Sequence, residues 1–345
     1  MIEVKNLSKY YGQKLAVDNI SFSIKKGEIV GFLGPNGAGK STTMNIITGY
    51  LSASSGSVTV SGYDILKNPD ECKKRIGYLP EFPPLYPDMT VREYLEFVFD
   101  LKCSKSKLKK EDHINRVVAL VRINHVETRL IRNLSKGYKQ RVGIAQALIG
   151  DPDILILDEP TVGLDPKQII EVRNVIRELG KEKTIILSSH ILQEIDSVCE
   201  KIIIINNGTL MADGSPEEIS DMLSSKEEFS LVVKGDKENA DNILTNEIEN
   251  VSDVKFIRET KEGVEYSVIS DFGKDARENV FYALAKANLP IVSMKSSSLT
   301  LEEIFLKLTG ENAVPLVKSI PAPKDTKKTF MEVFSDMIGI KKEGK

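Results

Sequence analysis

The sequence has few cysteines and no long apolar run. Its three cysteines, Cys72, Cys103 and Cys199, are widely spaced and form no CxxC pair, which argues against a disulfide framework or a zinc site. A reducing cytosol suits such a chain best. No secretory leader pattern opens it, and no apolar run approaches the roughly 18 to 20 residues that a membrane-spanning helix needs. If the protein works at a membrane, we expect another chain to cross it.

The sequence also has almost no excess charge. A formal net charge of -3 gives no bulk electrostatic reason to expect a nucleic-acid partner. One basic run, KCSKSKLKK at 102–110, is more typical of a solvated surface, with a nucleic-acid contact as the alternative. At 345 residues, with 41% hydrophobic and 28% charged side chains, the chain is long enough for more than one globular domain. We expect two domains.

From residue 1 to about 213, short apolar runs rich in β-branched residues alternate with helical patterns. Such runs are typical of strands buried on both faces, and the helices between them predict a mainly parallel sheet in an α/β domain. Other segments alternate apolar and polar residues and end at turn signals, which predicts antiparallel strands at one edge. The expected parallel strands are 28–33, 153–158, 183–189 and 201–206, and the expected antiparallel segments are 2–12, 16–27 and 55–65.

Between about 226 and 310 the pattern changes to strand, helix, strand, strand, helix, strand. This order matches the split βαβ arrangement of a small ferredoxin-like α+β domain. Its helices are expected at 237–249 and 273–288, and a further short helix is expected at 299–310.

The last stretch, 311–345, is expected to be a linker and a tail helix. Proline and lysine are frequent at 313–328, which is typical of a linker. Farther on, five apolar residues at helical spacing form one stripe. A helix docked on its own protein is one interpretation; docking to a partner chain or a membrane surface is the other, since lysines flank the stripe. The stripe consists of Phe330, Val333, Phe334, Met337 and Ile338.

The stretch GPNGAGKST at 34–42 directly follows an expected strand and precedes a helical pattern. It fits G-x-x-x-x-G-K-[ST], a loop whose backbone N–H groups point at phosphate and which leads into a helix. Lys40 is expected to reach the β- and γ-phosphates of ATP, and Ser41 to bind Mg²⁺ through its hydroxyl. Gly37 and Gly39 would let the main chain approach the phosphate oxygens. The candidate nucleotide-binding residues of the loop are Gly34, Pro35, Asn36, Gly37, Ala38, Gly39, Lys40, Ser41 and Thr42.

Two acids end the buried run in ILILDEP at 154–160. An acid at the carboxyl end of a parallel strand lies beside the phosphate loop, so Asp158 is expected to hold the Mg²⁺ shell. Glu159 is placed to accept a proton from water that attacks the γ-phosphate. His190, at the end of a neighbouring apolar run, is expected to hydrogen-bond the γ-phosphate or that water. Capping acids and a structural histidine are the plainer alternatives.

Five motifs occur in a fixed order: GPNGAGKST, LSKGYKQR at 134–141, ILILDEP, GLD at 163–165 and SSH at 188–190. Together they resemble the nucleotide-binding subunit of an ATP-binding cassette (ABC) transporter over about residues 1–213. The resemblance implies a P-loop NTPase cassette with a mainly parallel core sheet, an antiparallel β edge and a helical subdomain at about 86–150. It further implies that Tyr11 stacks on adenine and that Asp165 lies at a dimer seam; an ordinary strand aromatic is the alternative for Tyr11.

The motif LSKGY is expected to begin a helix. Ser135 is a good N-cap, yet Gly137 stands in the first turn, where glycine costs roughly 0.5 to 1 kcal/mol relative to alanine. In the family this turn meets the ATP held by a second subunit. By that resemblance, Gly137 is bare because a γ-phosphate approaches its N–H, and the helix dipole adds to the attraction. ATP binding would close a head-to-tail pair, and hydrolysis would reopen it.

The chain departs from the family pattern at two places. The usual signature is LSGGQ, so Lys136 replaces a glycine and Tyr138 replaces a glutamine. Lys136 either adds a cation near the triphosphate or points to solvent. Glu81 stands where the family has a glutamine that reaches Mg²⁺ and the water. A carboxylate binds Mg²⁺ at least as well, but it adds negative charge near the γ-phosphate.

Both departures, with the ferredoxin-like domain, resemble a subgroup that serves export-type permeases, which includes drug-resistance exporters, the gliding-motility ATPase and lipid-exporting ABCA proteins. In that subgroup the loop FPPLYPDMT at 82–90 lies where the coupling helix of the permease would dock. Phe82, Leu85, Tyr86 and Met89 give this loop apolar contact area. Alternatively, these side chains close the core of the helical subdomain.

We therefore expect an ATP-hydrolysing subunit that dimerises around two Mg-ATP, most simply as a homodimer. It would power a separate integral-membrane permease from the inner face of the cell membrane, without a nucleic-acid partner. The C-terminal domain is expected to pack against its counterpart or to regulate opening. The alternatives are a soluble ABC ATPase without a permease and a sensor that scarcely turns over ATP. The soluble class often carries two cassettes, a coiled-coil insertion or a strongly basic face, which this sequence lacks.

Overall fold

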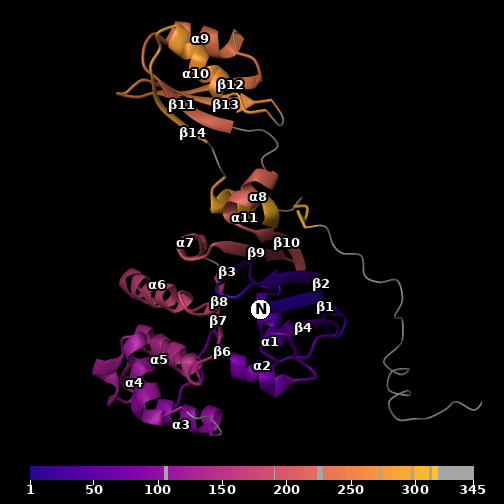
Figure 1. Ribbon diagram of the computed structural model, residues 1–345, viewed down its shortest axis with the longest axis vertical. Helices are drawn as coiled ribbons and strands as arrows, with labels where there is room; N and C mark the ends of the chain where they lie inside the picture. The colour runs from indigo at the N-terminus through magenta and orange to yellow at the C-terminus, as the bar shows by residue number, and fades with distance from the viewer. Residues whose placement is uncertain are drawn as a thin grey trace, which may run out of the picture.

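The computed structural model shows three β-sheets and the helices that cover them (Figure 1). The apolar stripe at 330–338, most of the linker at 313–328 and His190 lie outside the residues that the structure describes. The described residues are 1–104, 108–189, 191–223, 228–246, 248–271, 274–296, 299–310 and 313–317.

A six-stranded sheet forms the core of the first domain, in the order β10-β9-β3-β8-β7-β6. Every pairing from β9 to β6 is parallel, and β10 pairs antiparallel at one edge. The four parallel strands expected from the sequence are confirmed, and β6 is an additional edge strand. The strands are β3 (Ile29–Leu33), β6 (Ile76–Leu79), β7 (Ile154–Asp158), β8 (Thr184–Ser188), β9 (Lys201–Asn206) and β10 (Thr209–Gly214).

The expected antiparallel strands form a second sheet in the order β2-β1-β4-β5. One buried apolar cluster joins this sheet to the core sheet and includes Ile2, Val58, Phe32 and Ile203. Helix α1 (Lys40–Ile47) contacts β2, β4 and β7, and therefore lies where the two sheets meet. The strands are β1 (Ile2–Tyr11), β2 (Lys14–Ile24), β4 (Ser55–Val60) and β5 (Tyr63–Asp64), and the short helix α2 (Pro69–Arg75) follows them.

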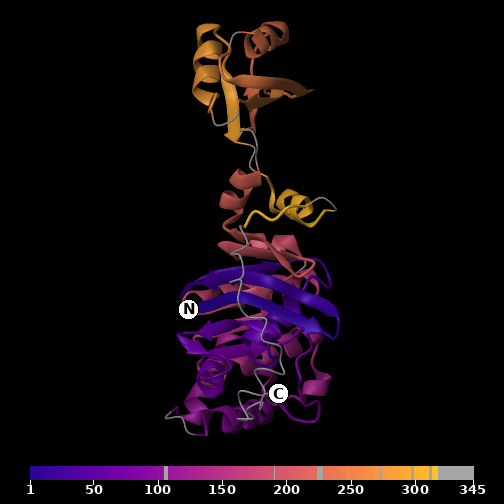
Figure 2. The same ribbon diagram turned by 90° about the vertical axis from the view of Figure 1, so that its right-hand side faces the viewer.

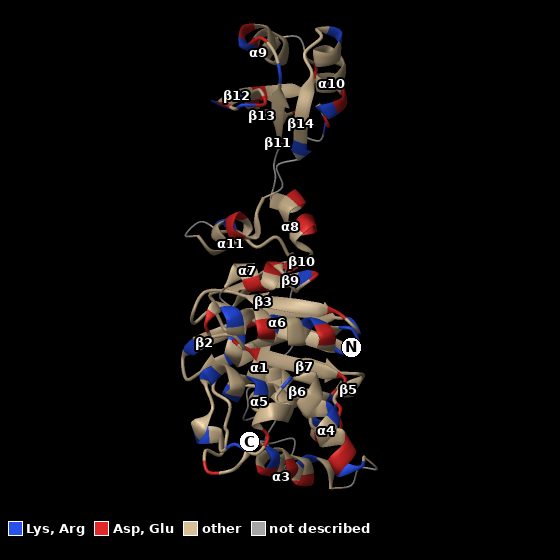
Figure 3. Cartoon of the chain, turned by 90° about the vertical axis from the view of Figure 1, so that its left-hand side faces the viewer, with Lys and Arg blue, Asp and Glu red and all other residues tan. Residues whose placement is uncertain are grey.

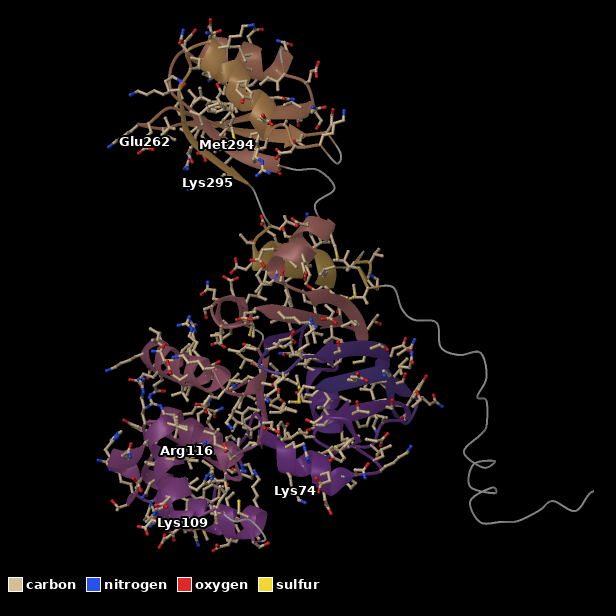
Figure 4. The ribbon with its side chains drawn as sticks, in the orientation of Figure 1. Lys74, Lys109, Arg116, Glu262, Met294 and Lys295 are labelled. Atoms are coloured by element: carbon tan, nitrogen blue, oxygen red, sulfur yellow. The ribbon has the colours of Figure 1, made fainter. Side chains whose placement is uncertain are left out.

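A helical layer covers the β6 side of the core sheet (Figure 1). It begins with α3, where Thr90 and Glu93 form a capping box that satisfies the first N–H groups of the helix. Arg116 on α4 lies on the outside of this layer (Figure 4). Helix α6 returns the chain from β7 to β8. The helices are α3 (Val91–Cys103), α4 (Lys110–Leu120), α5 (Lys136–Leu148) and α6 (Pro166–Gly180), with 3₁₀ turns at Asn124–Val126 and Ile131–Asn133.

The C-terminal domain is an antiparallel sheet in the order β12-β13-β11-β14, with two helices on one face. This is the ferredoxin-like arrangement that the sequence predicts. It has its own apolar core, which includes Phe229, Val268 and Leu284, and Met294 packs against it (Figure 4). The elements are β11 (Glu228–Val233), α9 (Lys237–Asn246), β12 (Val251–Glu259), β13 (Val264–Ser270), α10 (Arg277–Lys286) and β14 (Ile291–Ser296).

Two helices beyond Asp213 pack on the first domain rather than on the C-terminal sheet (Figure 2). Helix α8 (Pro216–Leu223) lies against β10, and α11 (Leu301–Thr309) lies against α8 and β9. The backbone N–H of Leu299 donates to Ser220 Oγ at 2.9 Å, which brings the two ends of the intervening segment together. Helix α11 falls within the 226–310 stretch assigned to the C-terminal domain, yet its buried apolar side chains belong to the first core.

Within the described part of the chain, no helix combines the length and the apolarity needed to cross a membrane.

In the view of Figure 3, Lys and Arg are interspersed with Asp and Glu along the elements.

Candidate functional site

A cleft of about 580 Å³ opens beside the start of α1. It gathers residues from distant parts of the sequence, because the carboxyl ends of β3, β6 and β7 meet at one edge of the core sheet. Seven of the ten predicted nucleotide-binding residues line it, whereas Gly34, Pro35 and Ala38 do not; Lys14, Ala16 and Val162 were not predicted. The lining residues are Tyr11, Lys14, Ala16, Asn36, Gly37, Gly39, Lys40, Ser41, Thr42, Glu81, Glu159 and Val162.

Lys40 is held by the phosphate loop itself. Its ammonium group donates to the backbone oxygen of Gly34 at 2.7 Å and to that of Pro35 at 3.3 Å, and the side chain is buried. Burial lowers the pKa of Lys40, and the nearby carboxylates of Glu159 and Asp158 oppose that change by favouring the charged form. The loop therefore presents a fixed cation to the cleft.

The two loop glycines serve different purposes. Gly39 has φ +108°, and a Cβ there would lie 2.7 Å from the backbone oxygen of Ala16, so the fold itself excludes a side chain. Gly37 has φ +81°, but no atom of the described residues lies within 4 Å of the position of a Cβ. The space beside Gly37 is therefore open to a ligand, as the sequence motif predicts.

Asp158 and Glu159 are fixed by Ser188, which ends the neighbouring strand. Ser188 Oγ donates to Asp158 Oδ1 at 2.5 Å and accepts the backbone N–H of Glu159 at 2.9 Å. Glu159 has φ +49°, a conformation that non-glycine residues rarely adopt and that is found preferentially at functional sites. Ser188 is completely buried. The sequence motif gave no sign that this serine holds both acids.

Glu81 and Tyr11 stand at the rim of the cleft. Glu81 follows β6 and is exposed, so its carboxylate is accessible from solvent. Tyr11 ends β1 with 47% of its surface exposed, and the Lys9 ammonium lies 5.4 Å from the centre of its ring. The ring offers a flat face on which a base can stack.

The donor set of the cleft fits Mg²⁺. Ser41, Glu81 and Glu159 bring oxygen atoms to one cleft. The buried Asp158 does not line it, but its carboxylate is near enough to raise the pKa of Lys40. Across the described residues, no three Asp, Glu, His or Cys side chains come together as a metal cage. Mg²⁺ at nucleotide sites uses one or two carboxylates together with phosphate oxygens, so an incomplete protein shell is what such a site needs.

The signature residues do not line this cleft. Ser135 caps α5 by accepting the backbone N–H of Tyr138, so the expected helix begins where the sequence predicts. Asp165 caps α6 in the same way by accepting the N–H of Gln168 at 2.9 Å. Both side chains are exposed at helix N-termini. Within a single chain, the surface that carries Ser135 and Asp165 is therefore separate from the cleft that the phosphate loop lines.

The structure gives Gly137 an internal reason to be bare. A Cβ at this position would lie 2.6 Å from Gln168 Oε1, because the Gln168 side chain of α6 packs across the glycine. The ammonium group of Lys136 occupies the space that a Cβ at Gly163 would need. Within one chain, Lys136 therefore covers the GLD turn instead of extending freely into solvent.

The Tyr138 side chain contacts other residues of the helical layer. Its hydroxyl lies 2.8 Å from His125 Nε2, and the Arg141 guanidinium lies 5.3 Å from the centre of its ring. Arg141 is in turn ion-paired with Glu171 on α6. The tyrosine that replaces the family's glutamine thus ties α5 to its neighbours.

The four apolar side chains of the loop at 82–90 differ in exposure, so they do not all fit the same expected role. Phe82 is 79% exposed and Tyr86 is 50% exposed, so they form an accessible aromatic surface. Leu85 and Met89 pack against the apolar core of the helical layer. Leu85 and Met89 therefore favour the alternative interpretation. The Tyr86 ring also packs edge to face against the rings of Tyr94 and Phe97 on α3, but half of its surface stays exposed, as does most of Phe82.

Comparison with known proteins shows the family of the chain. The family model described as ABC transporter matches residues 17–162. The bacitracin transport ATP-binding protein BcrA of Bacillus licheniformis is 34% identical, over 91% of this chain and 99% of that protein. The linearmycin resistance ATP-binding protein LnrL of Bacillus subtilis (strain 168) is 34% identical, over 90% of this chain and 98% of that protein.

Solved structures give the same result for the cassette. The dimeric structure of MJ0796, a bacterial ABC transporter cassette, has a TM-score of 0.57 at 27% identity and covers 62% of this chain and 98% of that one. A structure of an ATP binding subunit of an ABC transporter has a TM-score of 0.58 at 32% identity, over 64% of this chain and 92% of that one. The chain belongs to the ABC transporter family, as an ATP-binding and ATP-hydrolysing subunit.

Proposed function

We propose that two copies of the chain close around two Mg-ATP and that this closure drives a separate export-type permease. The observation that carries the proposal is the separation of the two halves of the site. The phosphate loop lines a cleft, whereas Ser135 lies at an exposed helix N-terminus that does not line it. A second copy, placed head to tail, would bring its Ser135 and Gly137 to the open side of the cleft. A dimeric cassette among the structural relatives supports this arrangement.

Several residues of the cleft are proposed to bind Mg-ATP. Lys40 and the N–H groups of the loop bind the β- and γ-phosphates, and Tyr11 stacks on adenine. Ser41, Asp158 and Glu81 would hold Mg²⁺, which when bound neutralises charge on the phosphates.

Two further residues would orient the attack on the γ-phosphate. Glu159 accepts the proton of the attacking water. His190 is proposed to orient that water or the γ-phosphate. Glu81 adds a negative charge that the family's glutamine lacks, and the Lys40 ammonium beside it offsets that charge.

The permease is proposed to dock on the exposed aromatic residues of the 82–90 loop. Phe82 and Tyr86 supply apolar area of the kind that anchors protein interfaces. Such docking would place the chain on the inner face of the cell membrane. Two relatives are named for bacitracin transport and linearmycin resistance, which supports an export-type permease as the partner.

The C-terminal domain is proposed to pack against its counterpart in the dimer or to regulate opening. The division predicted from the sequence, with an ATPase domain at 1–213, a second domain at 226–310 and a tail at 311–345, remains a proposal. The packing of α8 and α11 on the first core favours treating these two helices as part of the ATPase domain.

The Glu159→Gln variant tests the proposed hydrolysis. It keeps the size of the side chain but removes the proton acceptor, so turnover should fall roughly 10²- to 10⁴-fold while ATP still binds. Turnover is measured by phosphate release, and binding by a fluorescent ATP analogue. Glu182→Gln, at an exposed position, is the matched control. If Glu159→Gln keeps near-native turnover, a nucleotide sensor becomes the better description.

A further inference from the structure

A buried carboxylate outside the cleft has no role in the function proposed above. Glu194 lies on α7 (Leu192–Asp196) and is only 3% exposed, and it does not line the cleft. A carboxylate is costly to bury unless hydrogen bonds compensate for the lost water. Its contacts therefore indicate what it contributes.

One oxygen of Glu194 receives two hydroxyl groups from different segments. Thr161 Oγ1 donates to Glu194 Oε2 at 2.5 Å, and Ser189 Oγ donates to the same atom at 3.0 Å. Ser189 Oγ also accepts the backbone N–H of Ile191 at 3.0 Å. The other oxygen, Oε1, is buried and has no hydrogen-bond partner in the described part of the chain. Among the described residues, the hydrogen bonds of Glu194 are thus all made by one of its two oxygens.

The two segments that Glu194 joins carry the catalytic groups. Thr161 lies two residues after Glu159 in a turn where Val162 N–H bonds to Glu159 O and Leu164 N–H bonds to Thr161 O. This turn runs on to Asp165. Ser189 follows Ser188, which holds both acids of the cleft, and it directly precedes position 190.

We propose that Glu194 is a positioning residue for ATP hydrolysis, which fixes the 159–165 turn against the end of β8. This inference rests on the proposed role of Glu159 as the proton acceptor. Glu194 does not line the cleft, and it would act through Thr161 and Ser189. Packed apolar side chains of similar volume often stabilise a protein as well as buried ionic groups do, so stability alone does not explain this carboxylate.

The Glu194→Gln variant tests the proposal in the full-length chain. The amide keeps the volume, and its one oxygen can still accept both hydroxyls, but it carries no charge, so the two charge-assisted hydrogen bonds become weaker neutral ones. We expect kcat to fall roughly 10- to 100-fold, as for a small misplacement of a catalytic group, while KM for ATP and Tm stay close to the native values. Glu200→Gln, at an exposed position just after α7, is the matched control.

Thr161 supplies a second pair of variants. Thr161→Ser keeps the hydroxyl and should keep most of kcat, whereas Thr161→Val keeps the shape, loses the hydroxyl and should lower kcat as Glu194→Gln does. The double variant Glu194→Gln with Thr161→Val should be little worse than Thr161→Val alone, because both changes act on the same hydrogen bond. If Glu194→Gln fails to fold, the serine and valine pair decides alone.

The outcomes separate this inference from the proposed function. If Glu159→Gln is inactive but Glu194→Gln keeps native kcat, the positioning role is wrong and the proposed function stands. If both keep native kcat, the proposed function fails as well. If Thr161→Ser and Thr161→Val lose Tm and kcat together and equally, Glu194 has only a structural role.

Discussion

Two separate explanations account for the glycine at position 137. The sequence motif explains the glycine by the approach of a phosphate held by a second subunit. The structure adds a reason inside the chain, since the Gln168 side chain occupies the space that a Cβ would need. A side chain at this position would make the Gln168 side chain move aside, so the glycine by itself does not identify the binding surface.

Substitutions at these two positions separate the two reasons. Gly137→Ala alone should lower both Tm and turnover, because Gln168 must shift. Adding Gln168→Ala should restore Tm, and alanine in the helix contributes about 0.5 to 1 kcal/mol more than glycine. If a phosphate must approach this position, turnover stays low in the double variant. Turnover that recovers together with Tm would show that the glycine serves packing alone; thermal melts and phosphate release measure the two effects.

The sequence predicts the cleft residues well but not the residues that hold them. The phosphate loop is local, so its spacing alone places Lys40 and Ser41. Ser188 and Glu194 act through contacts with residues about thirty positions away in the sequence, across neighbouring strand ends. Which hydroxyl points inward depends on the register of β7 against β8, and no local pattern reports that register.

At the scale of elements, strands and helices follow from periodicity, but their packing partners do not. The succession of strands along the C-terminal domain was predicted correctly, because each strand has a clear apolar pattern. The strand β6 was not anticipated, since its four residues are too few to show a period. The apolar stripe of α11 predicts a helix, but nothing in the stripe indicates which of two cores it covers.

Helix α4 should make stability depend on pH through His113. Its ring is buried in the helical layer and accepts the N–H of Gly150 at 3.2 Å through Nε2. Burial lowers the pKa of His113 below its ordinary value of 6.5, although Asp151 opposes the change and Arg116 adds to it. Protonation therefore favours the unfolded chain. The contribution of the neutral ring is fully present above pH 6.5 and is lost as the pH falls through the lowered pKa.

Thermal melts at about pH 7.5 and about pH 5.5 check this dependence. The native protein should lose more Tm on acidification than His113→Gln, whose amide oxygen can still accept the N–H of Gly150. His125→Gln changes an exposed ring and should behave like the native protein. An equal loss of Tm in the native protein and in His113→Gln would rule out His113 as the source.

At the scale of the whole molecule, the packing of α8 and α11 predicts where the chain can be divided. Joining Leu223 to Leu299 through a short Gly-Ser linker removes the C-terminal sheet but keeps both helices. This variant should melt close to the native cassette. A chain that ends at Asp213 loses both helices and uncovers the core beneath them, at about 2 kcal/mol for each buried apolar side chain removed. The side chains lost are Ile219, Leu301, Ile304 and Leu308.

Calorimetry of both shortened chains gives the comparison. The chain that ends at Asp213 should melt well below the linked chain. If the two shortened chains melt at the same temperature, α8 and α11 do not stabilise the ATPase domain.

The central claim is that each ATP is enclosed by two chains, and mixing two inactive variants tests it most directly. Lys40→Met removes the ammonium of the phosphate loop. Ser135→Asp keeps a good helix N-cap but sets a negative charge against the triphosphate of the other chain. Each variant alone should be inactive. An equal mixture should regain about a quarter of native turnover, because half of randomly formed dimers are mixed and each mixed dimer has one intact site. Turnover that stays at the sum of the two separate variants would contradict the claim.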